Sequence, residues 1–570
     1  MGAALFLALA SAAVLVVIPL AVLIKTSWVE GRDRLADVVG SPAFRSAVVH
    51  SLELSAAATL LAVPVGVAIA LALRDRQLPG RAFWRAAVLL PLLVPDFVLG
   101  YSWLRAYARA GLTSELFGLA WMQIQGPVGV SVIVAVNTVP LVYLIIAVGL
   151  ATRAEPTTER AARASGAGPA TVLRTITLPL LAPAIATAAV LVFVLSMGAF
   201  AVPQLVGAPA GFGTITTRIY ADLALGSDPQ GFVEAITLAL LLVVVTLIIV
   251  TPAEALLGGR LQLGRMAARD TDWPSSSRTT RVIVTIAMAL YLMITSGLPL
   301  LALLSASVTR AIGVPSTPDN WTLDNFLAVL TPRTGQALSR SVLLALAAAS
   351  ILLMLGTIAA ALGRTRGGRS VSILITLTLV LPGSTLAIGL LIGYGRWLAD
   401  TVVIILLAYL AKLWALAHRP ISAAVDRLPS AGLHAARVSG AGLPTALVTV
   451  VVPLLRPALL AAWGVCFLTA LHEVTMSSLL YGPGSETLAV VVLNSADLGG
   501  VGVTAALSVQ LAEFQHVARR EEHLVAAEVK SLRIPRPSAQ LHAERHEEFA
   551  LRIRARAHTR LLREDNGQQV

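Results

Sequence analysis

Long apolar runs separated by short polar loops constrain the fold of this chain more than any other feature. A helix needs about 20 mostly apolar residues to cross the hydrocarbon core of a membrane. About eleven runs reach that length, and a twelfth, at roughly 501–512, ends early at Glu513. The sequence therefore predicts an all-α integral membrane protein, with runs at approximately 3–24, 48–73, 84–104, 128–150, 180–206, 232–253, 281–308, 340–362, 371–395, 401–417 and 454–480.

The composition of the 570 residues supports a membrane protein. Hydrophobic residues make up 56% of the chain and charged residues 13%, about half the charged fraction of a soluble domain. The net charge of +12 comes from arginines in short loops between the apolar runs, as the positive-inside rule predicts, so we expect no nucleic-acid partner. The one cysteine, Cys466, excludes a disulfide framework and a CxxC motif.

The loop charges predict the orientation of the chain. The first run is expected to span the membrane and not to be a signal peptide, because no basic segment precedes it and no small-x-small cleavage motif precedes Lys25. With the N-terminus in the cytoplasm, about 20 basic residues fall in cytoplasmic loops, Lys412 and Arg419 among them, against about 11 on the opposite side. We therefore predict a multi-pass protein with a cytoplasmic N-terminus.

A 25-residue segment occurs twice. ERAARASGAGPATVLRTITLPLLAP (Glu159–Pro183) aligns without a gap on LHAARVSGAGLPTALVTVVVPLLRP (Leu433–Pro457), and 14 of the 25 positions are identical. An even number of predicted helices separates the copies, so both halves share one orientation, which favours parallel over inverted repeats. The expected domains are residues 1–256 and 281–512, joined by a polar cytoplasmic linker at 257–280.

Each copy of the segment predicts a helix pair that projects into the cytoplasm. A short amphipathic helix should lead through a Gly-Ala-Gly turn into a second helix that enters the next span. Glycine permits a turn with positive φ and lets another protein approach closely. Proline in the first turn of a helix costs no hydrogen bond, because that N–H has no intrahelical partner. The same design at two matched positions indicates a docking element and not an ordinary connection.

The repeated segment resembles the EAA loop of permease subunits of bacterial ABC importers. The family pattern is EAA, three residues, Gly, nine residues and Ile-x-Leu-Pro. The matching loop residues are Ala161, Ala162, Gly166, Gly168 and Pro179 in the first copy and Ala435, Ala436, Gly440, Gly442 and Pro453 in the second. The sequence departs from the family at the glutamate, which is replaced by Arg160 and His434, with Glu159 displaced by one position.

Two such domains in one chain are similar to the ferric-iron importer permeases, and the thiamine and 2-aminoethylphosphonate permeases share this fused architecture. The resemblance implies two tandem six-helix MetI-like domains in parallel pseudo-repeat, with the last helix truncated. It also implies two copies of a cytoplasmic ATPase subunit that bind the ATP, a periplasmic or lipid-anchored binding protein, the bacterial inner membrane with its lipid, and no cofactor on this chain. Ferric iron is the expected substrate; thiamine, a phosphonate or a polyamine are alternatives.

Four carboxylates fall within or near the predicted spans. Glu53 and Glu234 lie near span ends, where interfacial solvation is expected. Asp96 and Glu473 lie deeper, and ionisable groups at such depth usually face a bundle interior or an aqueous cavity. A role in the translocation path and a role in helix packing are equally favoured for Asp96 and Glu473. Neither is expected to bind a metal, because the spacing of metal ligands is missing.

The chain lacks the sequence signatures of an enzyme. It contains no GxxxxGK[ST] loop, no GxSxG and no HExxH, so ATP hydrolysis is expected on a separate subunit. A proton-coupled secondary transporter is the alternative of a different class, because six-plus-six parallel repeats and buried acids also occur there. The duplicated cytoplasmic loop discriminates the two, since a secondary transporter does not need it.

The C-terminal region, 513–570, has a different composition. The twelfth run offers about 12 apolar residues, roughly 18 Å of helix, which is short of the roughly 30 Å core. We predict a helix that begins near Gly502 and continues past Glu513 as a charged helix outside the bilayer, with a poorly packed tail from about Pro535. A reading-frame disruption is favoured slightly over a lineage-specific cytosolic tail.

Overall fold

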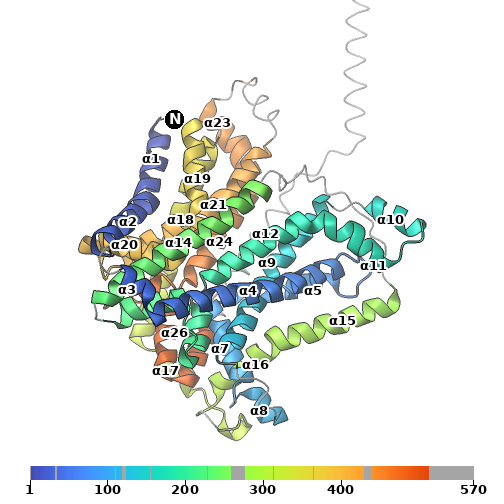
Figure 1. Cartoon of the computed structure of the whole chain (residues 1–570), viewed down its shortest axis with the longest axis horizontal. Coiled ribbons are helices and arrows are strands. Elements are labelled where there is room, and N and C mark those ends of the chain that lie inside the picture. The colour runs from blue at the N-terminus through green and yellow to red at the C-terminus, as the bar shows by residue number, and fades with distance from the viewer. Residues whose placement is uncertain are drawn as a thin grey trace, which may run out of the picture. The chain divides into compact units, whose positions relative to one another are not determined.

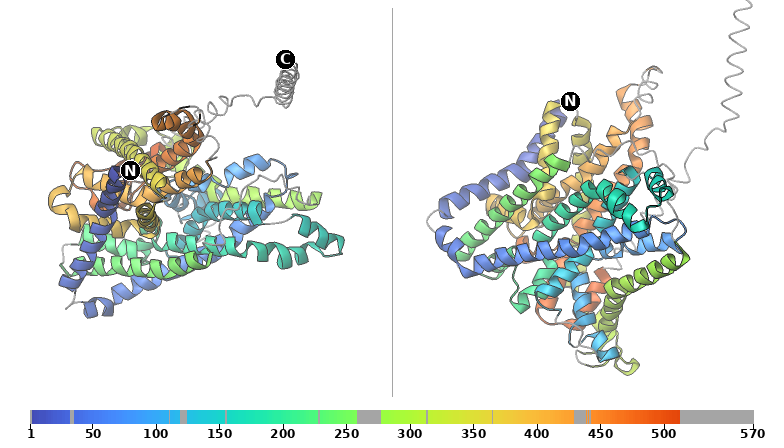
Figure 2. Two further views of the ribbon diagram at one scale, coloured as in Figure 1. Left: turned by 90° about the horizontal axis from the view of Figure 1, so that it is seen from above. Right: turned by 45° about the vertical axis from the view of Figure 1, so that its right-hand side comes forward.

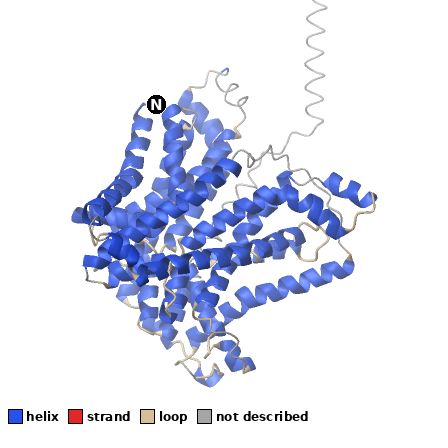
Figure 3. Ribbon diagram, viewed as in Figure 1, coloured by secondary structure: helices blue, strands red, loops and turns tan. Residues whose placement is uncertain are grey.

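The described part of the chain is helical. The computed structural model describes residues 2–31, 35–109, 111–118, 124–153, 156–226, 229–257, 277–311, 314–363, 365–428, 438, 440 and 442–511. Within these ranges the only extended pairing is an isolated bridge between Thr309 and Trp321 (Figure 3). The same ranges contain nine helices that are long and apolar enough to cross a membrane.

The first half contains five of these spans, and shorter helices connect them (Figure 1). Its elements are α1 (Gly2–Ala12), η1 (Ala13–Val17), α2 (Ile18–Gly31), α3 (Leu35–Gly40), α4 (Pro42–Ala72), α5 (Arg81–Ala87), α6 (Leu90–Leu93), α7 (Asp96–Tyr107), α8 (Leu112–Phe117), α9 (Pro127–Arg153), α10 (Pro156–Ala164), α11 (Pro169–Val172), η2 (Leu173–Thr177), α12 (Leu178–Met197), η3 (Pro203–Gly207), η4 (Ala208–Ala210), α13 (Ile215–Tyr220), η5 (Ala221–Leu225) and α14 (Pro229–Leu257).

The second half contains the other four spans in the same order. Its elements are α15 (Arg278–Leu292), η6 (Met293–Gly297), α16 (Leu298–Val308), η7 (Pro318–Asn320), α17 (Asp324–Val329), α18 (Pro332–Leu362), α19 (Arg366–Val380), α20 (Gly383–Leu398), α21 (Val402–Asp426), α23 (Leu443–Ala446), η8 (Leu447–Val451), α24 (Val452–Leu471), α25 (Ser477–Leu480), α26 (Leu488–Asp497) and a last apolar helix, Val501–Leu511.

Two of the predicted runs are not single straight helices but sharply bent helix pairs. The run at 84–104 falls on a helix pair bent by 98°, and the run at 371–395 on a pair bent by 112°. Pro95 and Pro382 precede the second helix of each pair. Because proline lacks an N–H and restricts the residue before it, the helical ladder stops there. With each bent pair counted as one span, the described residues contain up to 11 spans.

Two other predicted runs end earlier than expected. The runs at 180–206 and 454–480 stop being α-helical at Met197 and Leu471, respectively, and each is followed by a break in the chain. Apolar character does not locate the first break, because the residues directly after Met197 are still largely apolar, whereas the second break coincides with His472 and Glu473. The last helix begins at Val501, close to the predicted Gly502. The predictions for the charged helix and tail lie outside the described residues, as does most of the linker between Leu257 and Ser277.

The duplication extends to irregularities in the helices. The first span of each half contains a π-helical turn, η1 in one and η6 in the other. The span that follows each repeated loop contains another, η2 or η8. A π-turn inserts an extra residue into a helix and is costly enough to be uncommon. Its occurrence at the same two places in each half indicates that both halves share one structural plan.

Each half is built around three helices packed through small residues. Helix α4 packs on α9 and α12, and α18 packs on α21 and α24 (Figure 1). A Cβ atom added at Gly66 would lie 2.5 Å from the Cβ of Val142, and one added at Gly356 would lie 3.2 Å from the Cβ of Ala417. Lipid supplies no hydrophobic drive between helices, so close backbone approach at small residues holds such bundles together.

The first span of each half packs on the opposite half. Helices α1 and α2 contact α18, α19 and α20, and α16 contacts α7 (Figure 1 and Figure 2). The Tyr107 hydroxyl donates to the Ile294 carbonyl at 2.6 Å, and the Tyr394 hydroxyl donates to the Val14 carbonyl at 2.8 Å. Both carbonyls belong to π-turns, where the helical hydrogen-bond register is interrupted. This reciprocal exchange joins the two halves into one unit.

Candidate functional site

The four breaks in the helices surround a single cavity of about 430 Å³. Pro95 and Pro382 at the two bends line it, as do Gly198 and His472 directly after α12 and α24. The breaks come from both halves at equivalent places, so the cavity lies on the junction of the repeat. Irregular backbone at membrane depth is tolerated where it lines a water-filled cavity. The arrangement therefore has the form of a polar compartment between two helical bundles.

Asp96 is the first residue of α7 and is exposed to this cavity. Its Oδ1 accepts a hydrogen bond from the side-chain amide of Asn137, which lies on α9. No further hydrogen bond or ion pair to Asp96 occurs among the described residues. The sequence-based candidate Asp96 thus lies where a passing solute could meet it.

Glu473 lines the same cavity, but its carboxylate already accepts hydrogen bonds from the protein. The carboxylate accepts backbone N–H groups of Met476, at 2.9 and 3.0 Å, and of Ser477, at 3.1 Å. These donors belong to the start of α25, whose N–H groups have no partner inside the helix. Glu473 therefore acts as a helix cap. The structure brings the two candidate acids together and gives them different hydrogen-bonding roles.

Lys412 is a cavity residue that the sequence analysis missed. It was counted among the cytoplasmic loop charges, and that assignment is wrong, because it lies in the middle of α21 and lines the cavity. Its ammonium group donates to the carbonyls of Thr378 and Leu379, each at 3.4 Å, and of Leu381. A cation is favoured at these final carbonyls of α19. The available signal was a lysine inside an apolar run, which is rare unless the side chain has a polar partner.

Glu234 is not solvated at the interface, contrary to the expectation from its position. Its carboxylate accepts from Arg218 Nε at 3.0 Å and from Arg218 Nη2 at 3.3 Å, and it is buried. The chain after α12 folds back through α13 and places Arg218 beside the start of α14. Asp222 also pairs with Arg218, at 3.2 Å. Burial, opposed in part by Arg218, raises the pKa of Asp222 to about 7.

Glu53 differs from the other three acids. It lies within α4 and is exposed. The expectation of interfacial solvation for Glu53 stays a prediction.

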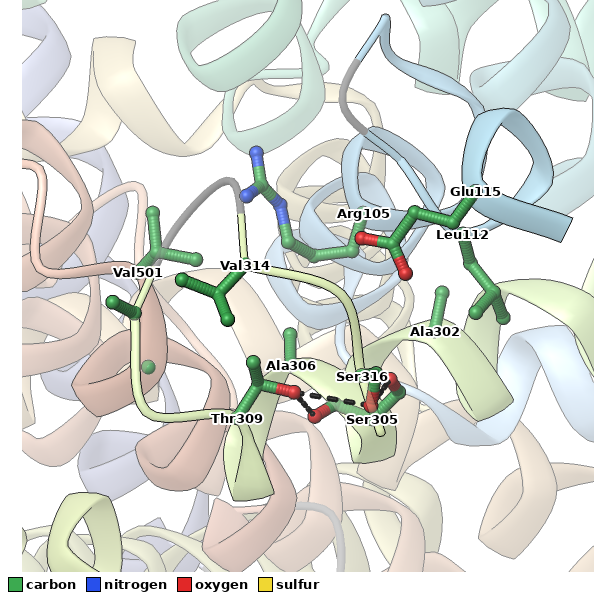
Figure 4. A pocket seen from close by; sticks show the side chains of 12 residues that line it. Arg105, Leu112, Glu115, Ala302, Ser305, Ala306, Thr309, Val314, Ser316 and Val501 are labelled. Carbon is green, nitrogen blue, oxygen red and sulfur yellow. Dashed lines mark hydrogen bonds between the residues drawn. The ribbon is translucent and has the colours of Figure 1, made fainter. Parts of the chain in front are cut away.

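A second, smaller cavity of about 60 Å³ lies between α7–α8 of the first half and α16 of the second (Figure 4). The Arg105 guanidinium stands over the Tyr101 ring, 5.4 Å from its centroid. Across the cavity, Ser316 Oγ is 2.7 Å from Ser305 Oγ and 3.1 Å from Thr309 Oγ1. A volume of this size holds only a few water molecules. It is too small to be the principal solute compartment.

The first repeated loop forms the predicted helix pair. Arg160, Ala161 and Ala162 lie on α10, and after the Gly-Ala-Gly turn the chain continues through α11 and η2 into α12, with Pro179 in its first turn. Figure 1 shows α10 and α11 beyond the ends of α9 and α12. The predicted helix, turn and proline are confirmed for this copy.

The turn of the first loop closes helix α10 with a Schellman motif. Gly166 has a φ of 87°, its N–H bonds the Arg163 carbonyl, and the N–H of Ala167 bonds the Ala162 carbonyl, each at 3.0 Å. This bond pattern requires a left-handed residue at the helix end, which favours glycine. A Cβ added at Gly166 would meet no atom of the chain within 4 Å, so the turn is open toward solvent.

Glu159 anchors this loop to the end of α4. The carboxylate is buried, accepts from Arg74 Nη1 at 3.1 Å and accepts from Thr177 Oγ1 at 2.6 Å. Glu159 therefore faces inward, not toward a partner. The aligned positions in the second loop are Leu433 and Val451, which cannot form these bonds. The two loops are thus attached to the bundle by different chemistry.

Only part of the second loop is described. His434, Ala435 and Ala436 lie outside the described residues. Gly440 has a φ of 80° and Gly442 follows it, and Pro453 lies in the first turn of α24, as the repeat predicts. The matched glycines of the two turns, Gly166 and Gly440, both have a left-handed φ.

Comparison with known proteins agrees with these features. The profile of the family described as binding-protein-dependent transport system inner membrane component matches residues 62–256. The molybdenum transport system permease protein ModB of Mycobacterium tuberculosis is 35% identical over 242 residues, covering 42% of this chain and 88% of that protein. A probable ABC transporter permease protein of Sinorhizobium fredii is 24% identical over 493 residues, covering 81% and 84%. The ferric transport system permease protein FbpB of Actinobacillus pleuropneumoniae is 24% identical over 500 residues, covering 83% and 70%.

Proposed function

Because this chain belongs to the family of inner membrane components of binding-protein-dependent transport systems, we propose that it forms the whole transmembrane path of one ABC importer. Such permeases are not themselves enzymes, and ATP is hydrolysed on cytoplasmic partner subunits. A binding protein outside the membrane delivers the substrate. The chain would lie in the bacterial inner membrane with its N-terminus and both repeated loops in the cytoplasm.

The repeated loop is the observation that carries this proposal. A helix pair with an open left-handed glycine turn stands at the end of the first bundle, and the sequence repeats it in the second half. Two loops provide docking positions for two ATPase subunits, one on each half. The residues proposed for docking are Arg160, Ala161, Ala162, Gly166 and Gly168, with His434, Ala435, Ala436, Gly440 and Gly442 in the second half and Pro179 and Pro453 fixing the entry of each span.

The cavity at the four helix breaks is the proposed translocation path. It lies at the junction of the two halves, where a rocking of one bundle against the other would change its access. Asp96 is the proposed solute contact, and Glu473 and Lys412 hold the broken helix ends in place. The domain limits we propose are 1–256 and 281–512.

Ferric iron is the proposed substrate. Support comes from the two-domain length of the chain and from its likeness to the ferric permease FbpB over 83% of the chain. Molybdenum is a second candidate, because the identity to the molybdenum permease is higher, at 35% over 42% of the chain.

Uptake measurements in a deletion strain decide between these substrates. Labelled ferric iron, molybdate, putrescine, thiamine and 2-aminoethylphosphonate would each be supplied to the deleted and the complemented strain. We expect loss of iron uptake alone on deletion. Unchanged iron uptake would exclude iron, and loss of molybdate uptake would assign the transporter to molybdenum.

A further inference from the structure

We infer that the central cavity is selective for cations, so that the transported solute carries positive charge as it passes Asp96. This inference rests on the proposed function, and it assigns a substrate class to the proposed path. The cavity contains two carboxylates and one ammonium group. The partners of these three groups decide which charge a solute would meet.

The ammonium group of Lys412 is already used by the protein. Its three N–H donors point to three carbonyls at the end of α19, those of Thr378, Leu379 and Leu381. An oxyanion in the cavity would have to replace one of these bonds. Moving Lys412 would leave these carbonyls without their donor, and an unsatisfied polar group inside the protein is costly. Lys412 is therefore a poor site for an anion.

The carboxylate of Glu473 is likewise used by the protein. Both of its oxygens accept backbone N–H groups at the start of α25. Lys412 and Glu473 both line the cavity, and their unit charges have opposite signs. The fields of the two charges therefore largely cancel at a distance from them. The second half of the molecule therefore contributes a cavity surface with little net charge.

Asp96 in the first half has no such compensation. One oxygen accepts the Asn137 amide, and among the described residues no cation lies within ion-pair distance of either oxygen. The side chain is exposed to the cavity and has room for a solute beside it. A single uncompensated carboxylate in a confined, low-dielectric compartment attracts cations and repels anions.

The cavity is not a site that would bind a metal ion through protein ligands alone. The described residues contain no group of three or more His, Cys, Asp or Glu side chains that could hold a metal ion. One carboxylate and one amide suit an organic cation or a metal ion that keeps its other ligands. The cavity would thus select a solute by the sign of its charge without binding it tightly. Weak binding is required because a transported solute must also leave.

Charged thiol reagents test this inference without knowledge of the solute. Leu195 lines the cavity and is 37% exposed, so Leu195→Cys in a Cys466→Ala background offers a reporter thiol. Its reaction rates with cationic trimethylammonium-ethyl and anionic sulfonatoethyl methanethiosulfonate would be measured on the full chain in lipid nanodiscs at pH 8. The ratio of the two rates reports the sign of the local potential.

We expect the cation-to-anion rate ratio to exceed that of 2-mercaptoethanol by about ten-fold or more. Asp96→Asn should remove most of this excess. Asp324→Asn, which neutralises an exposed carboxylate outside the cavity, should leave the ratio unchanged. A ratio no higher than that of the free thiol, a ratio insensitive to Asp96→Asn, or no reaction with either reagent would overturn the inference.

The inference of cation selectivity and the proposed function can be contradicted separately. Uptake of molybdate by the wild-type transporter would contradict a cationic solute and leave an ATP-driven importer intact. Absence of any ATP-driven uptake by the complete transporter, combined with a cation-selective rate ratio, would contradict the importer and leave the charge of the cavity established.

Discussion

At the scale of single residues, hydrogen-bond partners separate side chains that the sequence cannot tell apart. Asp96 and Glu473 are both acids beside apolar segments, and for both the sequence favours a path role and a packing role equally. Glu473 caps α25, whereas Asp96 accepts one amide and faces the cavity. Lys412 was assigned to a loop because basic residues usually mark loop ends, and only the final carbonyls of α19 explain a lysine inside a span. These roles depend on contacts between distant segments, which a single sequence does not contain.

Asp222 predicts a pH-dependent stability. Its raised pKa of about 7 means that the folded protein binds this proton more tightly than the unfolded chain does. The free energy of unfolding should therefore fall as the pH rises from about 4 toward 7 and level off above 7. Asp222→Asn should remove this contribution, leaving the Arg218–Glu234 pair in place. Thermal unfolding in detergent at pH 5 and pH 8 measures it, and an equal loss of Tm in both proteins would contradict the prediction.

Glu159 predicts a coupling between the first loop and the bundle. Its carboxylate is buried beside Arg74, so removing Arg74 takes a counter-charge away from a buried carboxylate. In a double-mutant cycle with Arg74→Met and Glu159→Gln, the two losses of stability should be non-additive by about 1 kcal/mol or more. Additive losses would show that the ion pair does not attach the loop. In the complete transporter, Glu159→Gln should reduce transport more than it reduces ATPase binding.

At the scale of elements, the repeat was a better guide than hydropathy. The alignment of the two loops predicts the first helix pair, its glycine turn and its proline, because these features follow from local backbone preferences. Hydropathy predicts where apolar runs lie in the sequence but not whether they are straight or bent in the structure. The segments at 84–104 and 371–395 are mainly apolar, yet they turn back at Pro95 and Pro382 to line a cavity. An apolar segment is compatible with either geometry, and tertiary packing selects the bend.

Gly166 predicts that backbone conformation at the loop controls docking. Valine at a φ of 87° is strained by about 1–2 kcal/mol, although its side chain would meet no atom of the chain. Gly166→Val should therefore leave membrane insertion and Tm nearly unchanged, and abolish transport and ATPase co-purification. Gly168→Val is the matched control, because Gly168 is equally open but has a φ of −68°. Equal loss of co-purification in both variants would assign the effect to bulk and not to conformation.

The tyrosine hydrogen bonds to the π-turn carbonyls predict that the contact between the two halves contributes measurably to stability. Tyr107→Phe deletes a hydrogen bond to a π-turn carbonyl, so it should lower stability by about 1 kcal/mol and reduce the Tm in detergent. Tyr291→Phe is the control, because among the described residues the Tyr291 hydroxyl makes no hydrogen bond to the first half, so its removal should leave the contact between the halves intact. Indistinguishable Tm values for the two variants would mean that the tyrosine bond does not hold the halves together.

At the scale of the whole molecule, the two halves of the chain share one structural plan but are not identical. The bundles, the bends and two π-turns in each half correspond, whereas η3, η5 and the groups at the cavity and at the loops do not. A repeat within the sequence makes the symmetric part predictable. The differences at Asp96, Lys412 and Glu159 arise from residues outside the repeated 25-residue segment or at positions where its copies diverge. Fusion of the halves allows such divergence, because each position can change without changing its counterpart.

The most direct test of the central claim is the energy source for transport. The chain would be reconstituted in proteoliposomes with its ATPase and binding protein, and uptake of the identified substrate would be measured with ATP on the cytoplasmic side, with and without a protonophore. The account predicts uptake that requires ATP and the binding protein and that persists when the proton gradient is collapsed. Uptake driven by a proton gradient without ATP would contradict it and would identify a secondary transporter.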